Sequence, residues 1–381
     1  MICELINRNY DMAYENNDLE LLYTYKKFPV FMGCTNIPID NDQFHDMNWY
    51  ISKSSGTIQL NPLLPLNIVY QLSHYSGTIG KVWDEHHSKF AEFILKFSHE
   101  NVLEIGGLHG TLAKKCKSFV DIDWTIIDPN ASSILSEYNI NAIKGFFDEN
   151  FVPDKNYKTI VHSHLLEHVY DINKFLKNIQ NILKQSSGKM IFSIPNMEVM
   201  LKRNYTNCLN FEHTYYLSED LAEYYLNKYN FKVIEKEYFK DDHSIFYYVE
   251  SNKEIVIPKN INFYEKNKQL FLTYINANLE EIKKINNYIS NHNGNIYLFG
   301  GHVFSQCLIS YGLNTKNIKC ILDNDINKQK RRLYGTDLIV ESPKILKDDM
   351  NPLVILKAGV YNNEIKNDIL NNINKNTVII N

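Results

Sequence analysis

The sequence is poor in residues that cross-link or break a chain, with 6 cysteines, 10 prolines and 15 glycines among 381 residues. The cysteines stand far apart, at positions 3, 34, 116, 208, 307 and 320, and no two of them form a C-x-x-C pair. This spacing predicts neither a disulfide framework nor a thiolate zinc site. We therefore expect buried, reduced thiols, as in a cytoplasmic protein.

The sequence also lacks a dominant charge and a long apolar run. Its 40 Lys and Arg residues nearly balance 44 Asp and Glu residues, which gives a formal net charge of −4. That balance provides no broad basic surface for nucleic acid and no polybasic membrane anchor. No apolar run approaches the roughly 20 residues of a membrane span, and the acidic N-terminal stretch has no apolar signal-peptide core. We expect a cytoplasmic protein without a membrane span, whose partner is a small molecule and not a nucleic acid.

Length and patterning indicate several domains. With 381 residues, 44% of them hydrophobic, the chain can form two or three buried cores. Residues 1–75 contain few helical patterns and several Pro, Asn and Asp breaks, so we expect a small irregular N-terminal module. Residues 76–250 alternate strand-like and helix-like segments. Residues 251–381 open with a charged helical linker and then begin a second, smaller alternation of the same kind.

Short apolar strands between amphipathic helices predict an α/β fold in which parallel strands are buried on both faces. The central block should form a doubly wound, Rossmann-like sheet with an antiparallel end, and the last block a second Rossmann-like domain. The helices that we expect are 82–99, 110–117, 171–184, 218–228 and 302–311, and the strands are 101–105, 124–128, 158–163, 188–194, 231–239, 244–249, 295–299, 318–322, 353–356 and 377–380.

A strand, a glycine turn and a helix follow one another in VLEIGGLHGTLAKKC, residues 102–116. Gly106 and Gly110 have the spacing E-x-G-x-x-x-G, with Gly107 between them, and glycine there lets a ligand approach the main chain. The start of the following helix offers free N–H groups. Glu104, at the end of the strand, is placed to bind the ammonium group of a methionine moiety. Taken alone, such a turn can also be purely structural.

An acidic residue after the next strand narrows the choice of ligand. Asp128, in WTIIDPN, follows Glu104 by 24 residues and can accept hydrogen bonds from both hydroxyls of a ribose. The turn matches neither the dinucleotide fingerprint G-x-G-x-x-G nor a P-loop. Together these features predict S-adenosylmethionine, which leaves as S-adenosylhomocysteine. We also assign to the cofactor Pro129, Phe147 at the adenine (unless it is a core residue) and His164 beside the methyl donor.

The second concentration of polar residues is FEHTYYLSED, residues 211–220. It lies at the carboxyl end of the predicted sheet, where open α/β sheets bind their ligands. Methyl transfer displaces an activated methyl group in line, so an enzyme mainly aligns the reactants and deprotonates the acceptor. His213, next to Glu212, suits that role near neutral pH. Alternatively, the pair only holds the loop before helix 218–228, for which Ser218 is the N-cap candidate.

Three further residues have two interpretations each. His243 either faces the acceptor pocket or belongs to the last strand pair. Tyr75, in HYSGTIG, either donates a hydrogen bond to a developing oxyanion or is a turn residue. His168, in SHLLEHVYD, is expected to be structural, although it lies in a loop that is common in methyltransferases.

In their order, these motifs resemble the sugar C-methyltransferases, which methylate nucleotide-linked keto-deoxysugars in antibiotic and surface-glycan pathways. The resemblance covers nearly the whole chain. It runs through SSGTIQL, HYSGTIG, VLEIGGLHG, LLEHVYD and FEHTYYLS, and continues with GGHVFS, ILDNDINKQKRRLYGT, VESPKIL and AGVYNNEI. It implies a small zinc-binding module, a class I methyltransferase domain and a C-terminal Rossmann-like domain.

The resemblance also implies roles for single residues. His213, with Glu212 as its neighbour, would remove a proton from the carbon beside a sugar ketone, and the enolate would attack the methyl group. Tyr75 corresponds to a tyrosine of the family's pocket. The turn GGHVFS either cradles a phosphate or nucleotide or is structural. The residues that we assign to the substrate are Asn210, His243, Gly301 and His302.

The sequence departs from the family at two places. The zinc thiolates would fall on Cys3, Ile6, Ser52 and Ser55. Only one thiolate is left, so we predict no zinc and no other metal. Asn210 stands where the family usually has a tyrosine. The expected function is methylation of a sugar, and O-methylation of a sugar or glycan hydroxyl by the same base is an alternative. A further alternative is a non-catalytic binding module of a glycan-assembly complex.

Overall fold

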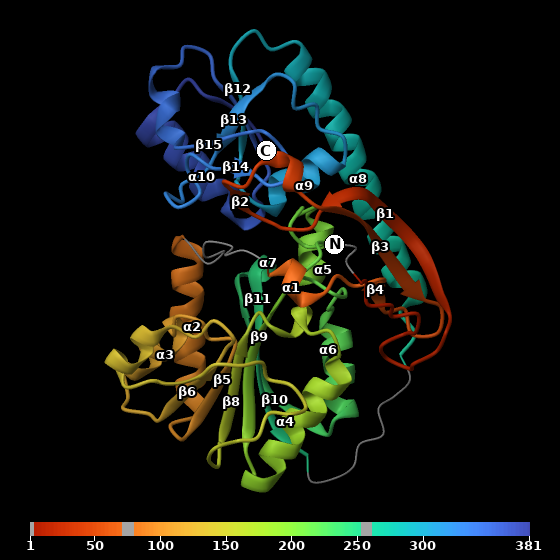
Figure 1. Ribbon diagram of the computed structural model, residues 1–381, viewed down its shortest axis with the longest axis vertical. Coiled ribbons are helices and arrows are strands. Elements are labelled where there is room, and N and C mark those ends of the chain that lie inside the picture. The colour runs from red at the N-terminus through yellow and green to blue at the C-terminus, as the bar shows by residue number, and fades with distance from the viewer. Residues whose placement is uncertain (1–3, 71–79, 253–260) are drawn as a thin grey trace.

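The computed structural model describes residues 4–70, 80–252 and 261–381 (Figure 1). Its largest sheet has seven strands in the order β10-β11-β9-β8-β5-β6-β7. Neighbouring strands from β7 to β9 run parallel, whereas β11 is antiparallel to both β9 and β10. This arrangement confirms the expected class I methyltransferase fold with its antiparallel end. The strands are β5 Val102–Ile105, β6 Trp124–Ile127, β7 Asn141–Ile143, β8 Thr159–Ser163, β9 Lys189–Pro195, β10 Phe231–Phe239 and β11 Ser244–Ser251.

Helices cover both faces of this sheet, which explains why its central strands are almost wholly apolar. In Figure 1, α2 and α3 lie on one side of the sheet and α4 and α6 on the other. Val102 and Leu103, which are neighbours on β5, belong to two different core clusters, one on each face. The helices are α2 Lys81–Phe97, α3 Thr111–Lys117, α4 Ile172–Ser186, α5 Met197–Lys202, α6 Glu219–Lys228 and the short α7 Lys240–His243.

The C-terminal part has a parallel sheet of its own, with five strands in the order β15-β13-β12-β16-β17. Reading the order from the edge gives the third, second, first, fourth and fifth strands, which is the Rossmann pattern. The second Rossmann-like unit is therefore present as expected. Its elements are α8 Tyr264–Ser290, β12 Ile296–Phe299, α9 Val303–Ser310, β13 Ile318–Leu322, β14 Arg332–Leu333, β15 Val340–Glu341, β16 Leu353–Leu356, α10 Asn362–Asp368 and β17 Val378–Ile380.

The N-terminal part is more regular than we predicted. It contains an antiparallel sheet of β1 Leu19–Pro29, β3 Phe44–Ser52 and β4 Ile58–Leu60, followed by the short helix α1 Leu66–Val69. Two register shifts interrupt the pairing of β1 with β3, between Leu21 and Tyr23 and between Tyr25 and Phe28. Each shift changes which side chains face the core. The alternation that reveals a strand in a sequence is therefore lost along β1.

The N-terminal sheet contacts both other parts of the chain. Its strands run beside α8 in Figure 1. A two-residue strand β2, Cys34–Thr35, pairs with β14 of the C-terminal part. Leu60 donates its N–H to the carbonyl of Thr214, which lies in the loop around Glu212 and His213 that we call the acceptor loop. The boundaries at residues 75 and 250 remain a prediction, and the N-terminal part shares backbone hydrogen bonds with both of its neighbours.

The remaining sequence expectations concern cysteines and membranes. The described cysteines, at 34, 116, 208, 307 and 320, are free and buried, as expected. Among residues 4–70, 80–252 and 261–381, no helix has the length and the apolar character needed to cross a bilayer.

Candidate functional site

The turn after β5 closes tightly around Glu104. Gly106 and Gly110 have positive φ angles of 79° and 68°, in the region that favours glycine. A Cβ atom added to Gly107 would lie 2.7 Å from the Cδ atom of Glu104. A side chain at this position would therefore displace the carboxylate. With glycine there, a ligand can approach both the main chain of the turn and the carboxylate of Glu104.

Glu104 is a buried carboxylate with one hydrogen-bond donor assigned to it. The indole Nε1 of Trp124, on the adjacent strand β6, donates to Oε2 at 2.8 Å. Burial raises the pKa of Glu104 to about 7, and the indole donor opposes that rise. A buried carboxylate of this kind gains from a cationic partner. It therefore fits the ammonium group of the methionine moiety, which our sequence analysis assigned to it.

Asp128 follows β6 and binds back to the glycine turn. Its Oδ2 accepts the N–H of Leu108 at 3.2 Å, and its Oδ1 accepts the N–H of Asn130 at 2.7 Å. The carboxylate is nearly buried and stands beside the turn, in the position that binds ribose hydroxyls in Rossmann folds. Pro129 continues the same loop. The residues present thus fit an adenosyl cofactor.

Phe147 and His164 have surroundings that the sequence did not reveal. The Phe147 ring packs against Phe151 and Phe175, with centroids 5.2 and 5.5 Å apart. These are core contacts, and its place at the adenine remains a prediction. The His164 ring lies against Trp83. Its Nε2 forms a hydrogen bond of 2.7 Å with the Oγ atom of Ser244. Its φ angle of 47° turns the chain sharply after β8.

The acceptor loop holds His213 in one tautomer. The ring Nδ1 lies 2.7 Å from the carbonyl oxygen of Cys208. A carbonyl can only accept, so Nδ1 carries the hydrogen and Nε2 carries the lone pair of the neutral ring. Burial lowers the pKa of His213 to about 4, which keeps the ring neutral at physiological pH. The neutral His213 ring thus presents its lone pair on Nε2.

Asn210 sets the shape of the turn that carries Glu212 and His213. Its Oδ1 accepts two backbone N–H groups, from Glu212 at 2.8 Å and from His213 at 3.0 Å. One side-chain oxygen therefore fixes the direction of both residues. Ser218 caps α6 by accepting the N–H of Leu221, as predicted. The loop consequently has a cap of its own, and the Glu212–His213 pair is not needed for that purpose.

Glu167 is a functional candidate that sequence reasoning missed. It lies in the short turn Leu166–His168 and is 1% exposed. Neither of its carboxylate oxygens has a hydrogen-bond partner among the described residues, and burial raises its pKa to about 8. His168 stands between Glu167 and Glu212, with a ring nitrogen 3.8 Å from an oxygen of each. Its ring is 5.0 Å from that of His213, so the loop LLEHVYD and the acceptor loop meet here.

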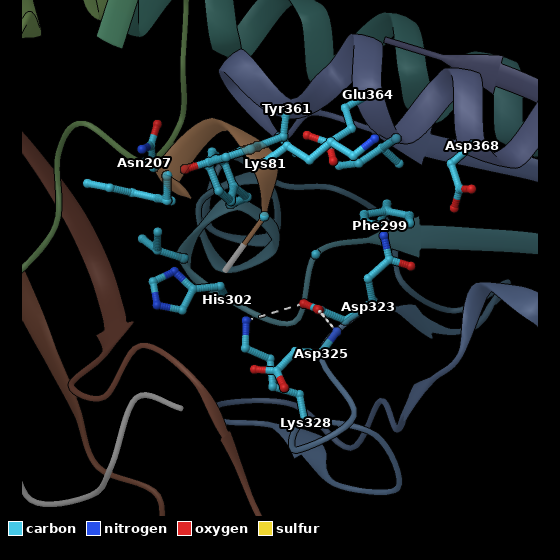
Figure 2. A pocket seen from close by; sticks show the side chains of 18 of the residues that line it. Lys81, Asn207, Phe299, His302, Asp323, Asp325, Lys328, Tyr361, Glu364 and Asp368 are labelled. Carbon is cyan, nitrogen blue, oxygen red and sulfur yellow. Dashed lines mark hydrogen bonds and ion pairs between the residues drawn. The ribbon is translucent and has the colours of Figure 1, made fainter. Parts of the chain in front are cut away.

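A cavity of about 790 Å³ lies where the acceptor loop faces the C-terminal Rossmann-like unit. Figure 2 shows His302 and Lys328 on one side of it and Tyr361, Glu364 and Asp368 on another. The volume is in the range of small-molecule sites. The lining residues come from four regions of the chain: Met32; Gly80, Lys81 and Trp83; Asn207, Asn210, Glu212 and His213; and Phe299, Gly300, His302, Val303, Phe304, Asp323, Asn324, Asp325, Lys328, Ala358, Tyr361, Glu364, Ile365, Asn367, Asp368, Asn371 and Asn372.

The lining of the cavity shows which of the predicted site residues lie close together. Asn210, Glu212, His213 and His302 line it together, although almost 90 residues separate the first three from the last. The adjacent Gly300, and not Gly301, lines the wall at the glycine turn. His243 is placed elsewhere, buried against Trp83 and His86. Tyr75 lies outside the described residues.

Asp323 repeats in the C-terminal unit the position that Asp128 has in the central one. It follows the second strand of its sheet, and its Oδ2 accepts the N–H of Gly301 at 2.8 Å. Lys328 contributes an ion pair to the same oxygen at 3.3 Å, drawn as a dashed line in Figure 2. The sequence contains the signal for this site, because an acidic residue follows the glycine turn by about 20 positions. Our prediction for that turn includes Gly301 and His302 but not Asp323.

Comparisons with known proteins find a match for the central unit of the chain. Residues 79–236 match a family model described as a methyltransferase domain. No curated protein matches the chain. Similar solved structures include an S-adenosylmethionine-dependent methyltransferase from Clostridium acetobutylicum ATCC 824, at 15% identity over 44% of this chain and 92% of that one, with a TM-score of 0.36. They also include the PH0226 protein from Pyrococcus horikoshii OT3, at 14% identity over 48% and 98% of the two chains, with a TM-score of 0.40.

A third solved structure is the magnesium protoporphyrin IX methyltransferase ChlM from Synechocystis PCC 6803 with bound S-adenosylhomocysteine. It has 9% identity over 46% of this chain and 90% of that one, with a TM-score of 0.36. At such identities and TM-scores we base no argument on the solved structures. The domain match confirms the class I methyltransferase fold, the enzyme class and the cofactor: the chain is an S-adenosylmethionine-dependent methyltransferase. The domain match does not test the sugar C-methyltransferase resemblance, which stays a prediction.

Proposed function

We propose that the enzyme methylates a nucleotide-linked sugar, with His213 as the general base. The observation that carries the proposal is the cavity of about 790 Å³, which brings the His213 loop and the C-terminal Rossmann-like unit to one space. A substrate that fills it has one end at the base and the other at a nucleotide-type turn. A sugar joined to a nucleotide has that two-part shape.

The donor side of the reaction uses the central unit. Bound S-adenosylmethionine supplies a methyl group that is already activated by its sulfonium. Glu104 would hold the ammonium group and Asp128 the ribose hydroxyls. These two residues orient the donor from one edge of the sheet. Methyl transfer then depends on alignment and on the state of the acceptor.

The acceptor side uses the His213 loop. The lone pair on Nε2 would take a proton from the acceptor, while Nδ1 stays bound to the Cys208 carbonyl. For a keto-sugar, the proton would come from the carbon beside the ketone, and the enolate carbon would form a bond to the methyl group as the bond from that methyl to sulfur breaks, which leaves S-adenosylhomocysteine. The neutral Glu167 carboxyl lies close to this loop and is available as a hydrogen-bond donor.

The C-terminal unit would bind the nucleotide. Gly300 has a φ angle of 108° and begins the turn before α9. Asp323 is placed for ribose hydroxyls, and Lys81 and Lys328 contribute positive charge to the same cavity. The carboxylates of Glu364 and Asp368 on the opposite wall suit sugar hydroxyls better than phosphate.

O-methylation of a sugar hydroxyl is the second candidate, and Asn210 is the observation that favours it. The related enzymes usually have a tyrosine at this position, whereas here Oδ1 of Asn210 is occupied by two backbone N–H groups. A hydroxyl acceptor needs a base but no enolate stabilisation. His213 can serve either reaction.

The test is an assay of S-adenosylhomocysteine formation with a panel of nucleotide-linked keto-sugars, their hydroxy analogues and free sugars. The proposal expects turnover with nucleotide-linked sugars only. Solvent deuterium exchange at the carbon beside the ketone, measured by NMR, separates carbon from oxygen methylation. Absence of turnover with every sugar, despite binding of S-adenosylmethionine in calorimetry, would refute the substrate class. Absence of cofactor binding would favour a non-catalytic module instead.

A further inference from the structure

Three imidazole rings converge in the central unit outside the acceptor loop. His86 is on α2, His164 follows β8, and His243 ends α7 just before β11. One ring nitrogen from each lies within 4.8 Å of the other two. His86 and His243 are buried, and His164 is largely covered. Three segments that are far apart in the sequence therefore bring one donor atom each to the same place.

The environment of His86 calls for a partner. Neither ring nitrogen has a hydrogen bond among the described residues, and the side chain is 0% exposed. Its ring is surrounded by those of Phe90, Phe239 and Phe246, at 5.3 to 6.0 Å. A neutral imidazole carries one donor and one acceptor, and buried polar atoms of this kind are normally satisfied. A cation that accepts the lone pair would satisfy the acceptor nitrogen of the ring.

The other two rings already point at one shared atom. The Ser244 hydroxyl oxygen lies 2.7 Å from Nε2 of His164 and 2.5 Å from Nδ1 of His243. The remaining nitrogen of His164, Nδ1, is 3.6 Å from a carboxylate oxygen of Glu167. A carboxylate hydrogen-bonded to the second nitrogen of a metal-binding histidine orients the ring and makes it a stronger ligand; Glu167 lies near that position at 3.6 Å but does not form the hydrogen bond.

We propose that His86, His164 and His243 form a binding site for a divalent transition metal ion of the zinc class. Three imidazoles with a fourth position open to water or to the Ser244 hydroxyl are a typical zinc ligand set. The nitrogens need only approach one another to about 3.3 Å, the separation set by Zn–N bonds of about 2.0–2.1 Å in a tetrahedron. The set contains no carboxylate ligand, which disfavours Mg²⁺ and Ca²⁺.

The site would connect α2 to the ends of β8 and β11. Trp83 packs edge-on against all three rings, at centroid distances of 4.9 to 5.1 Å, and it also lines the cavity. The ion would therefore hold one wall of the cavity in place. Our sequence analysis predicted no metal because it examined thiolate spacing, and this site has imidazole ligands in a different part of the chain.

The experiment uses the full chain without a polyhistidine tag, stripped with a chelator and titrated with Co²⁺ or Zn²⁺. We expect one equivalent of metal per chain by elemental analysis, a tetrahedral Co²⁺ absorption spectrum, and a melting temperature that rises with Zn²⁺. His86→Gln and His243→Gln should each lose the spectrum and the thermal shift. His99→Gln, which changes an exposed histidine of the same unit, should keep both.

Two results would overturn the proposal. One is the absence of a tetrahedral Co²⁺ spectrum in the unaltered protein. The other is full binding by both His86→Gln and His243→Gln, with loss only in His168→Gln, since that pattern assigns the metal to the neighbouring group of Glu167, His168 and His213. Circular dichroism of the stripped variants shows that a loss of binding does not come from unfolding. None of these readouts depends on catalytic activity.

Discussion

The indole Nε1 of Trp124 donates a hydrogen bond of 2.8 Å to the buried carboxylate of Glu104. Burial raises the pKa of Glu104 to about 7, and the indole limits that rise. The carboxyl is therefore neutral below pH 7 and ionised above it in the protein without cofactor. An ammonium group binds the ionised form. We predict that the affinity for S-adenosylmethionine rises as the pH increases toward 7 and levels off above it, at about tenfold per pH unit below the midpoint.

Calorimetry between pH 5.5 and about 8 measures this dependence, and two variants test its origin. Glu104→Gln should bind more weakly at pH 8 and show little dependence on pH. Trp124→Phe removes the donor that favours the charged form, so its midpoint should move to higher pH. A pH-independent affinity in the unaltered protein would contradict the assignment of Glu104 to the ammonium.

The second prediction concerns His213 and its bond to the Cys208 carbonyl. His213→Ala should reduce turnover by at least about 100-fold, because it removes the Nε2 lone pair that takes the proton from the acceptor. S-adenosylmethionine affinity should stay unchanged, since Glu104 and Asp128 bind the donor separately. His99→Gln is the matched control, and near-normal turnover of His213→Ala would remove this residue from the mechanism.

The pH profile of kcat/KM provides an independent check of His213. Burial lowers its pKa to about 4, so the neutral, active form predominates above that value. The rate contribution of the base is complete well above pH 4 and is lost as the pH falls through 4. We expect no inflection from His213 near 6.5. An inflection there that disappears in His213→Ala would mean that the imidazole is exposed to water in the working enzyme.

The third prediction concerns Asn210, whose Oδ1 accepts the N–H groups of Glu212 and His213. Asn210→Ala removes both bonds and should lower kcat about 10- to 100-fold through misplacement of the base. Asn210→Asp keeps the accepting oxygen and should retain most activity. Equal losses in the two variants would assign the effect to the NH₂ group instead, which donates to the carbonyl of Asn207 at 3.0 Å.

Much of the fold follows from local sequence. The spacing of Ile172, Leu176, Ile179 and Leu183 places one apolar stripe along α4, so the helix is readable without knowledge of its neighbours. The strand β1 is different, because its register shifts alternate the core face along its length. The strand can be recognised only from its pairing with β3, and the residue spacing of a single segment does not predict which strand it pairs with.

The candidate site also has a part that the local sequence predicts and a part that depends on how the chain packs. Glu104, Gly106 and Asp128 are close in sequence and belong to one strand–helix–strand unit, β5-α3-β6, so their motif predicts that they lie close together in the structure. The cavity has walls from α2, the acceptor loop and the C-terminal unit, and only the packing of these parts decides which side chains share it. The role of Glu167 also depends on burial from other segments, which gives its carboxyl a raised pKa of about 8.

The fourth prediction concerns the ion pair that joins the N-terminal and C-terminal parts. Arg332 and Asp42 form two parallel contacts, Nη1 to Oδ2 at 2.6 Å and Nη2 to Oδ1 at 2.7 Å. The Asp42 side chain is 0% exposed and that of Arg332 is 10% exposed. Removal of one partner leaves a buried charge without its counterion, so Asp42→Ala should destabilise the protein by about 3 kcal/mol or more.

Urea unfolding of Asp42→Ala, Arg332→Ala and the double variant measures the coupling between the two residues. Arg332→Ala should cost at least as much as Asp42→Ala, because Arg332 also donates to the carbonyls of Ile37 and Thr336, at 2.9 and 3.3 Å, whereas Asp42 keeps only the N–H of Gly335. The exposed pair Lys89–Glu92 on α2, with side chains about half exposed, is the control, and breaking it should change the unfolding free energy by less than about 0.5 kcal/mol. Equal effects of the two pairs would show that the contact between Arg332 on β14 and Asp42 of the N-terminal part contributes little to the stability of the folded chain.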